Sequence, residues 1–127
     1  MSVDEPNVID ITAIDHDKSE TLLVISDHLP WRIDDPDSLY NEGDHLQMLQ
    51  AKVYRYVHFI ESGELLRKVA KSAGTKSVIL IKFLYPLSAN ATNLVSNLKQ
   101  HLDSMGIDVR WEVYDSDGSG VTSSPAD

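Results

Sequence analysis

Two Asp-His pairs stand out among the residues that could carry out chemistry. Asp27-His28 ends an apolar run, and Asp44-His45 follows after a polar stretch. Imidazole and carboxylate groups together bind zinc, manganese or iron, and they also serve as acid–base pairs. The spacing matches no metal signature such as HExxH. We therefore treat these four residues as a candidate site, with His28, His45 and Asp44 as candidate metal ligands.

Two aromatic residues extend this candidate site. Trp31 follows Pro30 in the polar loop between the two pairs and is expected to cover the core, while Tyr85 ends a later apolar run. A structural interpretation stays open beside the chemical one. In it, His28 and His45 hydrogen-bond the loop, and Asp44 is an acid in the first turn of a helix.

Apolar periodicity predicts the elements that must position these residues. Strands are expected at 7–15, 21–27, 77–85 and 107–114, and helices at 42–62 and about 88–105. The second and third strands are apolar on both faces, whereas the first and fourth alternate, which indicates central and edge positions respectively. The conformation of residues 64–76 is left open between a short helix and a loop.

The resulting order, β-β-α-β-α-β, predicts an α+β (mixed α/β) fold of two layers. Right-handed crossovers make strands two to four parallel, with strand one antiparallel, in the order 1-2-3-4. Both helices then cover one face of the four-stranded sheet. The strand-to-helix connections gather at one edge, where ligands usually bind in such folds, and this edge carries the candidate site.

The other face of this sheet is expected to expose apolar residues of the two central strands. Such a face needs a cover, which could be a second copy of the protein, another protein, or the loop 28–41. The expected partner is therefore the protein itself, as a homodimer through the open sheet face, or another protein.

Length and composition bound the domain organisation. The chain has 127 residues, a net charge of -9 and no cysteine, which excludes thiol catalysis and zinc–thiolate sites. One α/β domain is expected at 7–114, after a disordered N-terminus at 1–6 and before a flexible acidic tail at 115–127. The start of the chain resembles no signal peptide, and no apolar run is long enough for a membrane span, so a cytoplasmic protein without membrane contact is expected.

Charge is unevenly distributed along the chain. Residues 1–45 hold 12 acids and 2 bases, residues 46–100 hold 2 acids and 8 bases, and residues 101–127 hold 6 acids and 1 base. The acidic total argues against nucleic acid as a partner, because phosphates would be repelled. On the predicted fold, the acids gather at the candidate site, while a basic surface around Arg67, Lys68, Lys71 and Lys76 lies at the opposite end.

Several strings resemble a small bacterial family of single-domain proteins of unknown function. They are ISDHL at 25–29, DHL at 44–46 and FIESGEL at 59–65. The resemblance covers about residues 8–114. It implies a bacterial, cytosolic, single-domain protein, and it brings no catalytic or binding residues with it.

Two functions are compatible with the sequence. The first is a non-catalytic binding or protein-interaction module, indicated by the open sheet face, the separated charges and the lack of a catalytic motif. It requires no cofactor. The alternative is a metal-binding protein or an acid–base enzyme that uses the Asp/His cluster, with a divalent metal as its cofactor. The first is preferred over an enzyme, and the enzymatic alternative stays open.

Overall fold

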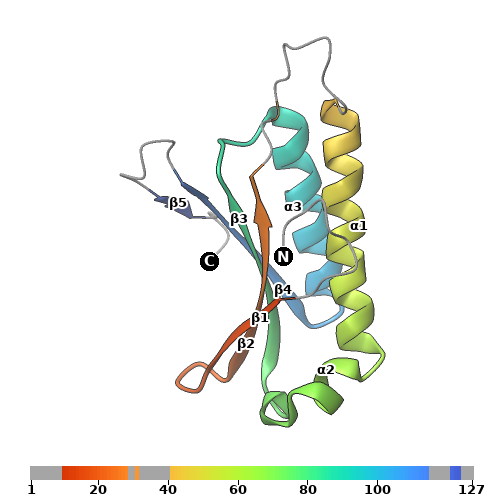
Figure 1. Ribbon diagram of the computed structural model, residues 1–127, viewed down its shortest axis with the longest axis vertical. Helices are drawn as coiled ribbons and strands as arrows, with labels where there is room; N and C mark the ends of the chain where they lie inside the picture. Colours follow the sequence, from red (N-terminus) through yellow and green to blue (C-terminus); the bar gives the residue numbers. More distant parts are fainter. Residues whose placement is uncertain (1–9, 29–30, 32–40, 115–120, 124–127) are drawn as a thin grey trace.

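A twisted sheet with helices on one face organises the part of the chain that the computed structural model describes, residues 10–28, 31, 41–114 and 121–123 (Figure 1). The strands are β1 (Asp10–Asp15), β2 (Glu20–Asp27), β3 (Lys76–Phe83), β4 (Ile107–Tyr114) and β5 (Val121–Ser123). The helices are α1 (Glu42–Glu61), α2 (Glu64–Lys68), the 3-10 turn η1 (Ala70–Ser72) and α3 (Ala89–Asp103).

The strand order confirms the predicted α+β topology. β1 pairs antiparallel with β2, while β2, β3 and β4 are parallel neighbours in the order 1-2-3-4. Right-handed crossovers produce this arrangement when a helix joins each pair of parallel strands. The second and third strands, which are apolar on both faces, hold interior positions as expected.

β5 is an element that the sequence did not predict. It pairs antiparallel with β4, so β4 is not the edge strand that its alternating pattern suggested. Val121 and Thr122 are β-branched and suit a strand, but the Gly, Ser and Asp residues around them indicated a flexible tail. The rest of the predicted tail and the predicted disordered residues 1–6 lie outside the described residues.

Two long helices form the second layer. α1 packs over β2 and β3, and α3 packs over β4, so both cover the same face of the sheet (Figure 1). Their apolar stripes have the spacing of three and four residues that places side chains on one side of a helix. The fully buried apolar stripe residues are Leu49, Val53 and Tyr56 of α1 and Ala91, Val95 and Leu102 of α3.

The segment left open by the sequence, residues 64–76, is mostly helical. Gly63 adopts a left-handed conformation with φ of 83°, which lets the chain turn from α1 directly into α2. Leu65 is buried and fixes α2 against the core. The chain then passes through η1 to Lys76, whose backbone N–H donates to Ser19 O at 2.8 Å and starts β3.

The other face of the sheet is called the helix-free face below, and its central part consists of alternate residues of three strands. They are Glu20, Leu22, Val24 and Ser26 of β2, Lys76, Val78, Leu80 and Lys82 of β3, and Asp108, Arg110 and Glu112 of β4. The expectation of an exposed apolar face is partly wrong, since Val24 and Val78 are buried and Leu22 and Leu80 are half-buried.

Among the described residues, none of the helices combines the length and the apolar character required to cross a bilayer.

Candidate functional site

Asp27 and His45 form a direct contact at the predicted strand-end edge. Asp27 is the last residue of β2, and its side chain lies on the helix side of the sheet. His45 lies in the first turn of α1. The His45 Nε2 atom is 2.6 Å from one Asp27 carboxylate oxygen and 2.8 Å from the other. The Asp27–His45 contact thus joins the end of β2 to the start of α1.

The pair is sealed from solvent. Both side chains have zero exposure. Trp31 stacks on His45 with ring centroids 3.6 Å apart and an interplanar angle of 12°. Its ring centroid also lies 6.0 Å from that of Phe83 in β3, and Trp31 is itself buried. In such surroundings an unpaired polar group is costly, so the contact between Asp27 and His45 is strongly favoured by the fold around it.

Asp44 has a different role from its neighbour. Its backbone N–H donates to the Asn41 side chain at 2.9 Å, and its carboxylate accepts from the Asn41 backbone N–H at 3.1 Å. This is a capping box, which satisfies two backbone donors at the start of α1. Asp44 is exposed and belongs to the helix start, as the structural interpretation expected.

The remaining predicted residues are not buried in this cluster. His28 is exposed, and Tyr85 is 36% exposed. Of the six candidates, the structure brings together Asp27, His45 and Trp31. Within the described ranges, no three His, Asp or Glu side chains form a group that could hold a metal ion.

A second contact ties the same edge together. Asn90, in the first turn of α3, donates from its side-chain amide to Glu42 at the start of α1, at 3.2 Å. Hydrogen bonds from Ser88 and Asn90 hold the pKa of Glu42 below its usual value. The starts of the two long helices are therefore linked beside the buried pair.

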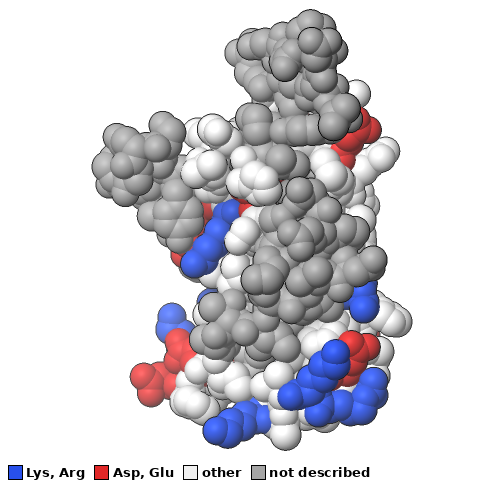
Figure 2. Space-filling model, viewed as in Figure 1, with Lys and Arg blue, Asp and Glu red and all other residues white. Residues whose placement is uncertain are grey.

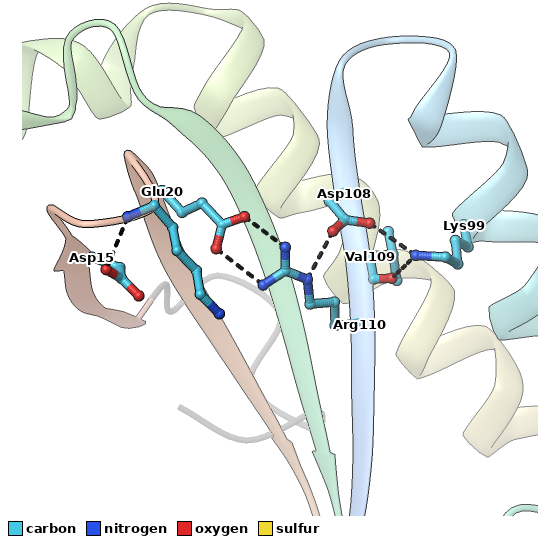
Figure 3. A network of polar contacts seen from close by, with 7 residues as sticks. Asp15, Glu20, Lys99, Asp108, Val109 and Arg110 are labelled. Atoms are coloured by element: carbon cyan, nitrogen blue, oxygen red, sulfur yellow. Dashed lines mark hydrogen bonds and ion pairs between the residues drawn. The ribbon is translucent and has the colours of Figure 1, made fainter. Parts of the chain in front are cut away.

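The structure also contains a charged network that sequence reasoning missed. Arg110 makes two hydrogen bonds to Glu20, at 2.6 and 3.0 Å, and a third to Asp108 at 2.8 Å (Figure 3). Lys99 of α3 donates to Asp108 and to Val109 O, both at 2.9 Å. We call these four side chains, Glu20, Arg110, Asp108 and Lys99, the ionic network.

The ionic network crosses the helix-free face. Glu20 is the register partner of Lys76, and Arg110 is the register partner of Leu80. The Glu20–Arg110 ion pair therefore passes across β3 at the level of Val78 (Figure 3). Val78 has zero exposure beneath it. The charged side chains thus cover part of the apolar surface that the sequence left open.

Strand order and residue parity could have found this network. Asp108 and Arg110 are polar positions in the alternating pattern of the predicted strand 107–114, and both lie on the helix-free face. The order 1-2-3-4 places β2 and β4 on either side of β3, about 10 Å apart, which an arginine side chain can span. Glu20 has the same parity as Leu22 and Val24, which places it on the face that carries Arg110, but the predicted second strand began one residue later, at position 21.

Mutual contacts shift the pKa values in the ionic network. Hydrogen bonds to Glu20 raise the pKa of Arg110 above its usual value, against the effect of burial. Burial alone would raise the pKa of Asp108, but hydrogen bonds from Lys99 and Arg110 outweigh it and lower that pKa. The carboxylate and the guanidinium therefore stay charged over a wide pH range.

A buried lysine is the other feature that the sequence did not reveal. Lys52 of α1 has zero exposure, and its Nζ atom lies 5.6 Å from the centre of the Tyr56 ring. The Tyr56 hydroxyl donates to Val24 O at 2.6 Å and joins α1 to β2. Lys52 lies three residues after Leu49 and four before Tyr56, so helical spacing places it on the buried side of α1, although a lysine is usually exposed.

Fold and site together define a two-layer α+β protein whose strand-end edge is closed by a buried Asp–His pair under a tryptophan. The chain belongs to a family of unknown function, DUF6572, which matches residues 1–115. This confirms the expected single-domain family of unknown function. Comparison with curated proteins and with solved structures gave no match.

Proposed function

We propose that this protein is a non-catalytic interaction module that binds a second copy of itself through the helix-free face. The observation that carries the proposal is the nearly balanced charge of this face. Over β2, β3 and β4 it holds three acidic residues, Glu20, Asp108 and Glu112, and three basic ones, Lys76, Lys82 and Arg110. Asp15 of β1, the register partner of Glu20, adds a fourth acid, whereas the chain as a whole carries -9.

Nearly balanced charge favours self-association at this face over other surfaces. Two copies with a large net negative charge repel each other, and the repulsion is smallest where their nearly neutral faces meet. Leu22 and Leu80 lie half-buried on the same face and still have apolar surface to lose on contact. Each square ångström of that surface contributes about 25 cal/mol when it leaves water.

The buried Asp27–His45 pair supports a non-catalytic role. A general acid or base must reach the proton that it transfers, directly or through one water molecule. Both side chains have zero exposure and lie beneath Trp31, so the geometry favours a structural contact between β2 and α1.

Light scattering at micromolar concentration tests this proposal. We expect the mass of a dimer for the wild type and of a monomer for Leu80→Asp. The matched control is Leu66→Asp, which introduces the same charge at a leucine on α2 that is 51% exposed and leaves the dimer intact. A monomeric wild type contradicts the proposal, as does equal dissociation in both variants.

Metal binding or acid–base chemistry is the second candidate, favoured by the 2.6 Å contact between Asp27 and His45. His28 follows Asp27 directly and is exposed, so it is the candidate ligand that a metal ion could reach. This candidate expects added zinc or manganese to raise the melting temperature, and it expects His28→Ala to abolish the shift. An unchanged melting temperature in the wild type rejects metal binding.

A further inference from the structure

A basic surface lies at the end of the molecule opposite the Asp27–His45 pair. It consists of Arg67 and Lys68 of α2 and Lys71 of η1, all exposed, together with Leu66, which is 51% exposed. We call these four residues the basic end. Figure 2 shows lysine and arginine side chains gathered over this end, where Figure 1 places α2. Lys76, also exposed, follows at the start of β3.

The basic end is presented by an ordered segment. Leu65 is buried next to Leu66 and anchors α2. The Ser72 hydroxyl donates to Val69 O at 2.7 Å, and Thr75 donates to Ser72 O at 2.6 Å. A surface whose backbone is already fixed loses little conformational freedom when a partner binds.

The charges of the basic end are only partly compensated. Lys68 lies 3.7 Å from Glu64, and this lysine side chain is 66% exposed. Arg67 donates to the carbonyl oxygen of Ser62 at 3.4 Å, which leaves its charge in place. Among the described residues, Arg67 and Lys71 take part in no ion pair. Glu61 and Glu64 are the acids nearest in the chain, so a positive surplus remains.

From this surface we infer that the basic end is a docking site for a short acidic polypeptide segment that carries an apolar side chain. The three cations, Arg67, Lys68 and Lys71, attract carboxylates. Leu66, which precedes Arg67 in α2, offers an apolar contact. The inference goes beyond self-association, because it concerns a different surface and a different partner.

Screening explains why a short segment fits better than an extended polyanion. At physiological salt, charges interact over a Debye length of about 8 Å. A short peptide on the basic end meets only the local positive charge. Nucleic acid or an anionic membrane extends further and also meets the rest of a chain that carries -9. The phosphate backbone also offers no apolar group for Leu66.

Fluorescence anisotropy with a labelled peptide of Asp, Glu and Leu tests this inference. We expect binding that weakens about fivefold in Arg67→Glu and in Lys71→Glu, since each replaces an attraction by a repulsion. Leu66→Ala weakens it as well. A peptide with Gln in place of Glu and Asn in place of Asp binds at least tenfold more weakly.

The matched pair of variants is Lys71→Gln and Gln47→Glu, each of which lowers the net charge by one. Gln47 is exposed and lies 14 residues before the end of α1, about 21 Å along the helix, so its change alters peptide binding less than twofold. Equal losses in Lys71→Gln and Gln47→Glu overturn the inference, because they indicate a response to net charge alone.

Two further probes separate the class of partner. The probes are a single-stranded oligonucleotide and vesicles with anionic lipid. The assignment to a polypeptide is overturned if either one binds more tightly than the peptide and loses this binding in Lys71→Glu. Light scattering on Lys71→Glu keeps this result distinct from self-association: the variant remains a dimer if the helix-free face is the dimer interface, whether or not the peptide binds.

Discussion

The Asp27–His45 pair and the Glu20–Arg110 pair share the same shortest contact, 2.6 Å, but lie in opposite surroundings. The first is sealed under Trp31 with zero side-chain exposure. The second lies on the helix-free face, where the Arg110 side chain is 28% exposed and shares its charge among several partners. Distance alone therefore does not determine what a polar contact does; access to water and the number of partners do.

These surroundings imply different consequences when a partner is lost. Water cannot replace a missing partner at a buried carboxylate or imidazole without a change in the fold around it, so the full desolvation cost remains. On the helix-free face, water can solvate the groups that Arg110 leaves behind. The comparison therefore predicts a large and salt-independent effect at one pair and a smaller, salt-dependent effect at the other.

The largest effect is expected for Asp27→Ala. It leaves the imidazole of His45 buried without its carboxylate, and the loss in unfolding free energy should be about 3–5 kcal/mol. Urea unfolding followed by circular dichroism measures it. Asp44→Ala is the control, since it removes only a capping contact worth about 1 kcal/mol. Similar losses in the two variants would contradict the structural role of the buried pair.

A smaller loss, about 2 kcal/mol, is expected for Arg110→Ala, which removes three charge-assisted hydrogen bonds from a partly exposed site. Because salt screens exposed charges, this loss should shrink when urea unfolding is repeated at high salt. The loss in Asp27→Ala should stay constant under the same change. An Arg110→Ala effect that does not depend on salt would remove the contrast between the two pairs.

The fold was largely predictable from the sequence because apolar periodicity carries it. Alternation at Ile107, Val109 and Trp111, and the stripes of the two long helices, determine which faces are buried. Right-handed crossovers then leave few topologies. β5 was missed because its three residues lie among Gly, Ser and Asp, where local composition indicates a tail although pairing with β4 stabilises a strand.

The candidate site was predictable in location and only partly in membership. The chain order places Asp27 and the first turn of α1 at one edge, so the approach of His45 to Asp27 follows from topology. In the Asp44-His45 pair, His45 turns inward and Asp44 does not. This choice depends on the helix phase and on the Asn41 cap, which composition does not reveal. The ionic network was not predicted because Glu20 and Arg110 belong to different strands, and their pairing depends on the register across β3.

Acid should weaken the ionic network through Asp108. Its pKa is lower in the folded protein than the ordinary value of 3.8, so the unfolded chain takes up a proton at higher pH than the folded one. The stabilisation is present above the ordinary pKa and is lost as pH falls through the folded pKa. In urea unfolding, the stability difference between wild type and Asp108→Asn should therefore be smaller at about pH 3 than near pH 6. A difference that is constant between these pH values contradicts the assigned direction.

The smallest effect is expected for Lys68→Ala, because the Lys68 side chain is more exposed than those of the two pairs compared above. Lys68 lies 3.7 Å from Glu64 with 66% of its side chain exposed, and such surface pairs contribute less than about 0.5 kcal/mol. Its Nζ atom is also 6.0 Å from the Phe59 ring, at the outer limit of a cation–π contact. Urea unfolding should give wild-type stability, with Lys68→Arg as the control that keeps the charge. A loss above 1 kcal/mol would show that the lysines of the basic end support the fold, and it would remove the distinction between a surface that stabilises the protein and one that is free to bind.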